Sequence, residues 1–310
     1  MHGTDTLELW QDGTKLNADN YENKIQGGQF RIGSASDTYG NFQGDIAEII
    51  FFNFALNGAQ KIIVDNYLAA KYGLTIANDY FNYQVTHPYD VAGIGRVNLA
   101  NTHRNAQSAK ILSLGDASDL GNGEFVIFGH DDASVGSWTS TEAPIGQRLA
   151  REWRLTETGD VGTVDISIDT SALPTKPAGY EDYVIWIDSD GDFSAGATQH
   201  PMNISDGEYI ASGIDISDGD YIAIGIIQTV QFALTESSGS EGESPANIEV
   251  VLNAALGSDV DVDYKVTGGT AEGSGTDYTL LGSGTLTITA GQEKDTIQLS
   301  LNDDGDIELE

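Results

Sequence analysis

The sequence of 310 residues contains no cysteine and only five histidines. Disulfide bonds and thiolate metal sites are therefore excluded, and a zinc site would need histidine and carboxylate ligands. The lack of cysteine does not identify a redox compartment, because many extracellular bacterial proteins share it. No run of 18 apolar residues occurs, so we expect no insertion into a membrane.

Basic residues are also scarce, with 14 Lys and Arg against 48 Asp and Glu and a formal net charge of −34. No basic stripe is available to neutralise phosphates, which excludes nucleic acid and anionic membranes as expected partners. An acidic excess of this size repels itself at low ionic strength. We therefore expect salty surroundings, bound divalent cations, or both.

Common catalytic motifs are missing. There is no Gly-x-Ser-x-Gly elbow, no His-Glu-x-x-His helix and no Gly-Lys dipeptide of a phosphate loop. Gly93-Ile94-Gly95 lacks the third glycine of a dinucleotide fingerprint and lies in a β context, so we interpret it as a tight strand turn. The chain is therefore not expected to be a complete enzyme, although paired carboxylates of a glycoside hydrolase would leave no such motif.

The residues that are abundant indicate an all-β protein. Thirty-seven glycines and 13 tyrosines accompany Thr/Val/Ile alternations separated by Asp-Gly, Asn-Gly and Gly-Ser clusters. One helix is predicted near 58–72, because Asn57 can cap its start and Gly73 suits the left-handed position that ends it. We predict tandem β-sandwich domains over 1–78, 79–227 and 228–310, with that one short helix.

In the first segment we predict strands at 7–10, 30–33 and 46–53. The segment resembles the C-terminal part of a laminin-G or concanavalin-A-like sandwich, which implies that the front half of that sandwich lies elsewhere and that this chain is a fragment. The resemblance rests on Phe30-Arg31-Ile32-Gly33, on Phe42-Gln43-Gly44-Asp45-Ile46-Ala47-Glu48-Ile49 and on Tyr67-Leu68-Ala69-Ala70-Lys71-Tyr72-Gly73.

The middle segment contains a series of predicted strands at 91–96, 125–130, 151–155, 164–168, 183–187 and 221–227. Its pattern resembles an uncharacterised β-domain that follows laminin-G-like domains in large secreted bacterial proteins. The resemblance implies an architecture and no chemistry. Histidines and arginines also gather in this segment, and we interpret them as loop hydrogen-bond donors and as counterions of local carboxylates.

The third segment resembles a truncated Calx-beta repeat, through Val230-Gln231-Phe232-Ala233-Leu234-Thr235-Glu236, Ile248-Glu249-Val250-Val251-Leu252, Thr276-Asp277-Tyr278 and Leu301-Asn302-Asp303-Asp304-Gly305-Asp306. The resemblance implies Ca²⁺ bound by acidic residues at one end of a sandwich. The alternative is that 303–306 is a solvated turn, since Asp and Gly favour turns. The implied ligands are Glu236, Glu241, Asp277, Asp303, Asp304 and Asp306.

A second candidate calcium site follows the apolar run 183–187, where Asp188, Asp190 and Asp192 alternate along one loop. The loop is not an EF-hand, because Gly191 stands fourth where that motif needs glycine sixth. A small calcium loop and a plain hairpin turn are equally consistent with these residues.

These observations predict a calcium-stabilised adhesion or spacer segment of a bacterial surface protein, secreted or held at the cell surface. The alternative is a carbohydrate-binding module or a polysaccharide-acting enzyme, for which Trp138, between Ser137 and Thr139, is the exposed aromatic candidate. Glycans or other cell-surface proteins are the expected partners. A homo-oligomer formed through open sheet edges is a further expectation.

Overall fold

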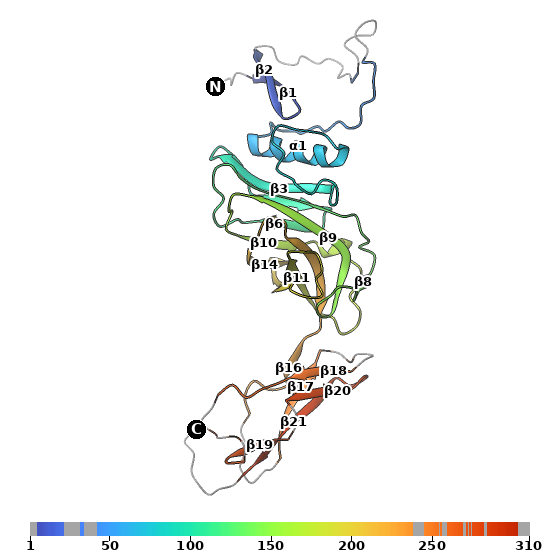
Figure 1. Cartoon of the computed structure of the whole chain (residues 1–310), viewed down its shortest axis with the longest axis vertical. Helices are drawn as coiled ribbons and strands as arrows, with labels where there is room; N and C mark the ends of the chain where they lie inside the picture. Colours follow the sequence, from blue (N-terminus) through green and yellow to red (C-terminus); the bar gives the residue numbers. More distant parts are fainter. Residues whose placement is uncertain are drawn as a thin grey trace. The chain divides into compact units, whose positions relative to one another are not determined.

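The computed structural model describes residues 5–21, 32–33, 42–237, 245–253, 255, 259–268, 271, 273, 275–281 and 284–302. The described chain is mostly β-strand with one α-helix (Figure 1), which confirms the predicted all-β class. The helix is α1 (Gly58–Tyr72), and a short 3₁₀ turn, η1, spans Thr170–Ala172.

The strands before α1 are β1 (Asp5–Gln11) and β2 (Thr14–Tyr21). Those of the middle segment are β3 (Tyr89–Asn98), β4 (Asn101–His103), β5 (Asn105–Ser108), β6 (Leu112–Gly115), β7 (Glu124–His130), β8 (Trp138–Thr139), β9 (Gln147–Thr158), β10 (Thr163–Ile168), β11 (Asp182–Asp188), β12 (Thr198–Pro201), β13 (Asn203–Ser205), β14 (Glu208–Asp215) and β15 (Tyr221–Ile227). The last six are β16 (Val230–Phe232), β17 (Ala246–Leu252), β18 (Val260–Asp263), β19 (Tyr278–Leu280), β20 (Thr285–Ile288) and β21 (Lys294–Leu301).

Two larger sheets form the middle segment. One has the strand order β12-β11-β15-β9-β7-β3-β4, with β8 paired to β9, and the other has the order β13-β14-β10-β6-β5. The central strands β7, β11 and β15 are buried almost throughout, as expected for strands covered on both faces. The predicted strands 91–96, 125–130, 151–155, 164–168, 183–187 and 221–227 all fall within observed ones.

The chain divides into two compact units. The first comprises 1–132, 153–165 and 215–219, and the second comprises 133–152, 166–214 and 220–310. The first unit includes the β1–β2 hairpin, α1 and the antiparallel pairs β3–β7 and β7–β9. The second unit includes the antiparallel pairs β11–β12, β11–β15 and β13–β14, and all the strands from β16 onward.

The helix begins and ends as the sequence predicts. Asn57 and Gln60 form a capping box, and Gly73 adopts the left-handed conformation with φ 64°. Its buried face packs on the middle segment, because Ala59 and Ala70 lie in one core cluster with Val91 and Phe125. The side chain of Asn66 extends this attachment: it donates to the Asn78 carbonyl and accepts the Tyr80 N–H, each at 2.8 Å.

The Gly93-Ile94-Gly95 sequence lies inside β3, so its interpretation as a turn is wrong. A methyl group on Gly95 would come within 2.0 Å of the Phe125 ring, and one on Gly93 within 2.6 Å of the Val126 carbonyl oxygen. These glycines allow β3 and β7 to lie close together.

Residues 46–53, predicted as a strand, form neither helix nor strand. A β-strand is defined by hydrogen bonds to a neighbouring strand, and among the described residues none pairs with this segment. Most of its large apolar side chains are exposed, including Ile46, Ile49 and Phe52. Of the predicted strand 30–33, only 32–33 are described, and they form a bend.

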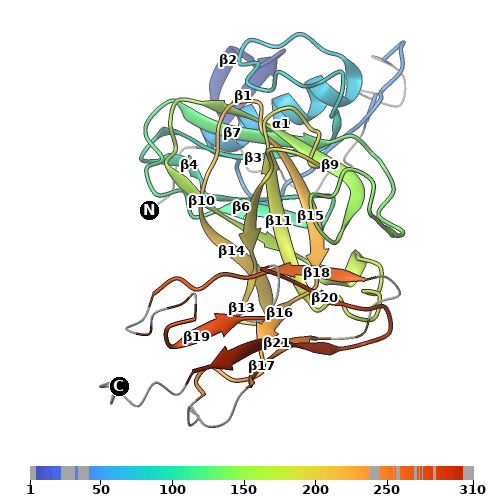
Figure 2. The same cartoon turned by 60° about the horizontal axis from the view of Figure 1, so that its bottom comes forward.

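The third segment has a four-stranded antiparallel sheet of order β16-β17-β21-β19 and a two-stranded sheet, β18–β20 (Figure 2). Val250, Leu252, Ile288 and Ile297 form its buried core, and Tyr264 and Leu286 pack against that cluster. Residues from both sheets therefore share one apolar interior, as in a sandwich.

Candidate functional site

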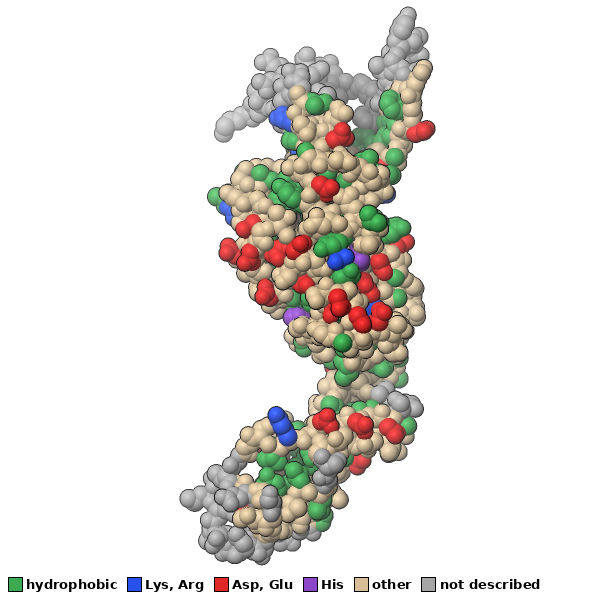
Figure 3. All heavy atoms as spheres, viewed as in Figure 1, with side chains coloured by type: hydrophobic (Ala, Val, Ile, Leu, Met, Phe, Trp, Pro, Cys, Tyr) green, Lys and Arg blue, Asp and Glu red, His purple; other side chains and the backbone are tan. Residues whose placement is uncertain are grey.

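Acidic side chains far outnumber basic ones on the face shown in Figure 3. The first acidic candidate is the loop after β11. Asp188 is buried and its Oδ1 accepts the N–H groups of Asp190 and Gly191 at 2.8 and 2.7 Å. Asp190 in turn accepts the N–H of Asp192 at 2.8 Å. These contacts are those of consecutive Asx turns, in which carboxylates satisfy backbone donors.

Asp192 is held by a serine and lies near a buried cation. The hydroxyl and N–H of Ser194 both donate to its Oδ1, at 2.6 and 3.1 Å, and these bonds lower the pKa of the Asp192 carboxyl, with a smaller contribution from Arg148. Arg148 is buried over the Phe193 ring, and its Nη2 lies 2.9 Å from Glu152. The loop is therefore anchored by contacts within the protein.

The structure does not gather the three loop carboxylates into a metal-binding group. Within the described residues, no set of three or more His, Cys, Asp or Glu side chains is placed to hold a metal ion. Asp190 and Asp192 are exposed while Asp188 is buried. The calcium assignment at Asp188, Asp190 and Asp192 stays a prediction, and the observed contacts are those of the plain turn.

The second acidic candidate is one end of the four-stranded sheet, which we call the acidic end. The strand β16 runs antiparallel to β17, and the first residue of β17, Ala246, faces Leu299 near the end of β21. The first residue of β19, Tyr278, faces Leu301, the last residue of β21. The finishing end of β21 and the starting ends of β17 and β19 therefore coincide, and β16 runs toward this end but stops with Phe232 opposite Val250.

Two of the six predicted ligands at this end are described. Glu236 is exposed in the segment that follows β16, and Asp277 is half-buried immediately before β19. Asn302 joins the strand ends: its N–H donates to the Asp277 carbonyl at 2.9 Å and its side chain donates to the Thr276 carbonyl at 3.2 Å. Glu241, Asp303, Asp304 and Asp306 lie outside the described residues.

The aromatic candidate Trp138 is less exposed than predicted. It is half-buried in β8, its indole N–H donates to the Pro174 carbonyl at 3.2 Å, and its ring lies 6.1 Å from that of Tyr183. Both the polar atom and part of the ring surface are therefore used within the protein, which leaves less of Trp138 for stacking on a sugar.

The histidines and arginines of the middle segment have structural contacts. The buried His130 accepts the Asp132 N–H at Nδ1, which places its proton on Nε2, 3.1 Å from Asp90. Burial lowers the pKa of His87 to about 4. Arg151 donates to the Ala133 carbonyl at 2.9 Å. The hydrogen bonds of His130 and Arg151 agree with a structural role, but these two residues lie in β7 and β9 rather than in loops, so that part of the interpretation is wrong.

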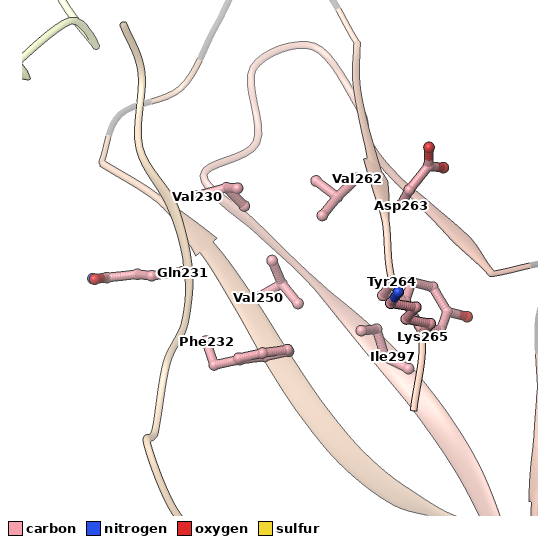
Figure 4. Close-up of a pocket in the computed structure, with 9 residues that line it drawn as sticks. All are labelled: Val230, Gln231, Phe232, Val250, Val262, Asp263, Tyr264, Lys265 and Ile297. Carbon is pink, nitrogen blue, oxygen red and sulfur yellow. The ribbon is translucent and has the colours of Figure 1, made fainter. Parts of the chain in front are cut away.

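Sequence reasoning missed an apolar groove in the third segment. The groove has a volume of about 320 Å³, near the lower end of the roughly 300–1,000 Å³ found for ligand pockets. Figure 4 shows its lining, in which Gln231 points away from the other side chains. The sequence feature that could have indicated this groove is the alternation of apolar and polar side chains in Val230-Gln231-Phe232. The apolar walls and floor are Val230, Phe232, Val250, Val262 and Ile297, and Lys265 stands at the rim.

Comparison with known families divides the chain in two. The family model described as Domain of unknown function (DUF8202) matches residues 60–220, and that of the Calx-beta domain matches residues 226–309. The first match begins inside α1, the helix that packs on β3. No curated protein and no solved structure matches the chain. The laminin-G-like interpretation of 1–78 has no match among these families, and it stays a prediction together with the boundary at 78/79.

Proposed function

Because the chain belongs to the DUF8202 family over residues 60–220 and continues into a Calx-beta domain, we propose that it is a calcium-stabilised adhesion or spacer segment of a bacterial surface protein. Calx-beta domains are typical of calcium-binding extracellular repeats. No described helix has the length and apolar character needed to cross a bilayer. A location outside the cell, secreted or at the surface, is part of the proposal.

The observation that carries the proposal is the meeting of separate strand ends at the acidic end. Glu236 follows β16, Asp277 precedes β19, and Asn302, the last described residue, contacts Asp277. In the sequence, Glu241 lies between β16 and β17, and Asp303 follows Asn302 directly. The topology thus directs three acidic stretches, far apart in the sequence, to one end of the sheet.

The donor chemistry at this end fits calcium. Ca²⁺ takes six to eight oxygen ligands from carboxylates, carbonyls and water, and the acidic end offers carboxylates and backbone carbonyls without thiol or imidazole. We assign Glu236, Glu241, Asp277, Asp303, Asp304 and Asp306 as the residues that would hold the ion. A bound cation would also reduce the self-repulsion of a chain with net charge −34.

The proposed role is mechanical. An ion shared by the segments at 233–245, 273–277 and 303–306 would hold the turns of the Calx-beta domain in one conformation, because each carboxylate ligand restrains the loop that carries it. The glycan-binding alternative has weaker support, since Trp138 is half-buried and its N–H is already bonded.

The test is thermal unfolding of the chain in excess chelator and then in millimolar Ca²⁺. A ligand that binds only the native state stabilises it by RT ln(1 + [L]/Kd), about 2.7 kcal/mol at a hundredfold excess over Kd. Asp277→Asn should reduce the calcium-induced rise in Tm. The matched control is Asp295→Asn on β21, which should keep the full rise, because Asp295 is exposed at the start of β21 and far along the strand from the acidic end. An unchanged wild-type Tm would contradict the proposal.

A further inference from the structure

Two tyrosines from different sheets of the middle segment meet in what we call the aromatic corner. Tyr183 lies on β11 and Tyr209 on β14, which belong to different larger sheets. Their ring centroids are 4.7 Å apart and their planes meet at 70°. Tyr183 is 6% exposed and Tyr209 is half-buried. Strands therefore build the corner, and part of it faces solvent.

A cation of the same chain occupies the aromatic corner. The Nζ of Lys176 lies 4.1 Å from the ring centroid of Tyr183 and 5.8 Å from that of Tyr209, and it donates to the Glu181 carbonyl. Both distances fall within the roughly 6 Å over which an aromatic ring attracts an ammonium group. The corner thus combines two rings and a carbonyl acceptor around one ammonium group.

The charges beside the aromatic corner also favour a cation. Burial lowers the pKa of the Lys176 ammonium, and the carboxylates of Asp182 and Glu181 oppose that shift. Both acidic residues are exposed, and Asp182 also accepts the hydroxyl of Thr229. Exposed carboxylates next to the rings attract an approaching cation, and a chain with net charge −34 attracts basic partners in general.

The rings and the cation are held by different parts of the fold. Lys176 belongs to the connection between β10 and β11, residues 169–181, which has exposed residues at 171–172, 175 and 177–178. The same connection is held at a second point, where the Pro174 carbonyl accepts the indole N–H of Trp138 at 3.2 Å. Because the rings sit on strands and the cation on a surface loop, exchange of the cation leaves the aromatic corner in place.

We propose that the aromatic corner is a binding site for a primary alkylammonium group, the side chain of a lysine on a partner protein, and that Lys176 is an internal competitor for this site. The Glu181 carbonyl favours a primary over a quaternary ammonium, because only the primary group has an N–H to donate. A partner lysine displaces Lys176 and makes the same contacts. This docking point goes beyond the calcium role and does not depend on it, so it is measured in chelator.

The internal competitor sets the affinity for an external lysine. A group on a short flexible tether acts at an effective concentration of roughly a millimolar, which an external ligand has to overcome. Lys176→Ala removes the competitor and opens its space, so it should bind a lysine probe at least about tenfold more tightly than wild type. Lys176→Met removes the charge but still fills the space, so it should bind no more tightly than wild type.

The experiment is calorimetric titration of the whole chain with Nα-acetyl-lysine methylamide. The norleucine analogue, which lacks the ammonium group, should not bind, and tetramethylammonium should bind more weakly than the lysine probe. Adding Tyr209→Leu to Lys176→Ala should weaken binding about fivefold, because one ring is lost. The control is Lys110→Ala in the turn between β5 and β6, which should keep the wild-type affinity. Circular dichroism and Tm would confirm that each variant is folded.

The wild-type chain gives a check that needs no substitution. The tyrosine rings shift the NMR signals of the Lys176 side chain, and saturating lysine probe should return these signals to the positions of a solvated lysine. Signals that stay unchanged would overturn the proposal. A Lys176→Ala chain that binds the probe no more tightly than wild type would overturn it as well, and so would tetramethylammonium binding as tight as that of the lysine probe.

Discussion

The indole N–H of Trp153 donates to the hydroxyl oxygen of Ser108 at 3.1 Å, and both residues are fully buried. Trp153 belongs to β9 and Ser108 ends β5, so this bond joins the two larger sheets of the middle segment. A hydrogen bond between the sheets fixes their relative position more specifically than apolar contact alone.

Ser108→Ala should destabilise the protein by about 1–3 kcal/mol, because it leaves the buried indole N–H without an acceptor. Urea unfolding followed by tryptophan fluorescence measures this change. The control is Ser189→Ala, an exposed serine in the loop after β11, which should change stability by less than about 0.5 kcal/mol. Equal effects of the two substitutions would show that the hydrogen bond between Trp153 and Ser108 contributes nothing to the free energy of unfolding.

Gly95→Ala should destabilise by about 1–3 kcal/mol, because the added methyl group would meet the Phe125 ring. Chemical denaturation of the wild type and the variant gives the difference in their free energies of unfolding. Gly268→Ala is the matched control, since a methyl group there meets nothing within 4 Å. A Gly95 variant as stable as wild type would mean that β3 and β7 separate at little cost.

Arg148→Met should cost about 3–5 kcal/mol, because Glu152 would lose the buried cation that lies 2.9 Å away. The exposed pair of Lys294 and Glu249, 2.7 Å apart, provides the comparison. Lys294→Met should cost at most about 1 kcal/mol, since solvent screens that pair. Both values come from denaturant titration at pH 7, and a reversed order would contradict the assignment of Arg148 as an anchor.

Acidification should destabilise the middle segment through His87, whose pKa burial lowers from 6.5 to about 4. The unfolded chain takes up this proton first, so the stabilising contribution is complete above about pH 6.5 and is lost as the pH falls toward 4. One pKa unit corresponds to about 1.4 kcal/mol, which gives a loss of roughly 3 kcal/mol at most.

Urea unfolding of wild type and His87→Gln at pH 7 and pH 4.5 measures this loss. The variant should lose less stability between the two pH values. Burial also lowers the pKa values of His103 and His200, and their contributions are common to both proteins and cancel in the comparison. An equal loss in the two proteins would rule His87 out as the source.

Features set by short-range patterns were predictable from the sequence. The helix followed from a cap at Asn57 and a glycine at position 73, and the middle strands followed from their apolar runs. Features that depend on residues far away in the sequence were not predictable. The pattern of residues 46–53 predicts a strand, but a strand also needs a neighbouring strand to pair with. The turn was assigned to Gly93 and Gly95 without knowledge of how closely β7 approaches them.

The candidate site was predictable in outline. The resemblance around Asp277 anticipated the Calx-beta match, whereas the meeting of strand ends at Asn302 requires the sheet register. The groove between β16 and β18 was not predicted, because the sequence does not reveal which strands have open edges. The burial of Trp138 likewise depends on Tyr183, 45 residues away in the sequence.

The attachment of the helix to the segment after it also has a kinetic consequence. Tyr80 lies outside any regular element, yet its amide hydrogen is donated to the fully buried side chain of Asn66 in the middle of α1. Exchange of that hydrogen with solvent deuterium requires α1 to lift from its core contacts. The Tyr80 amide should therefore exchange as slowly as the helix interior, and it would report on the opening of α1 as one cooperative unit.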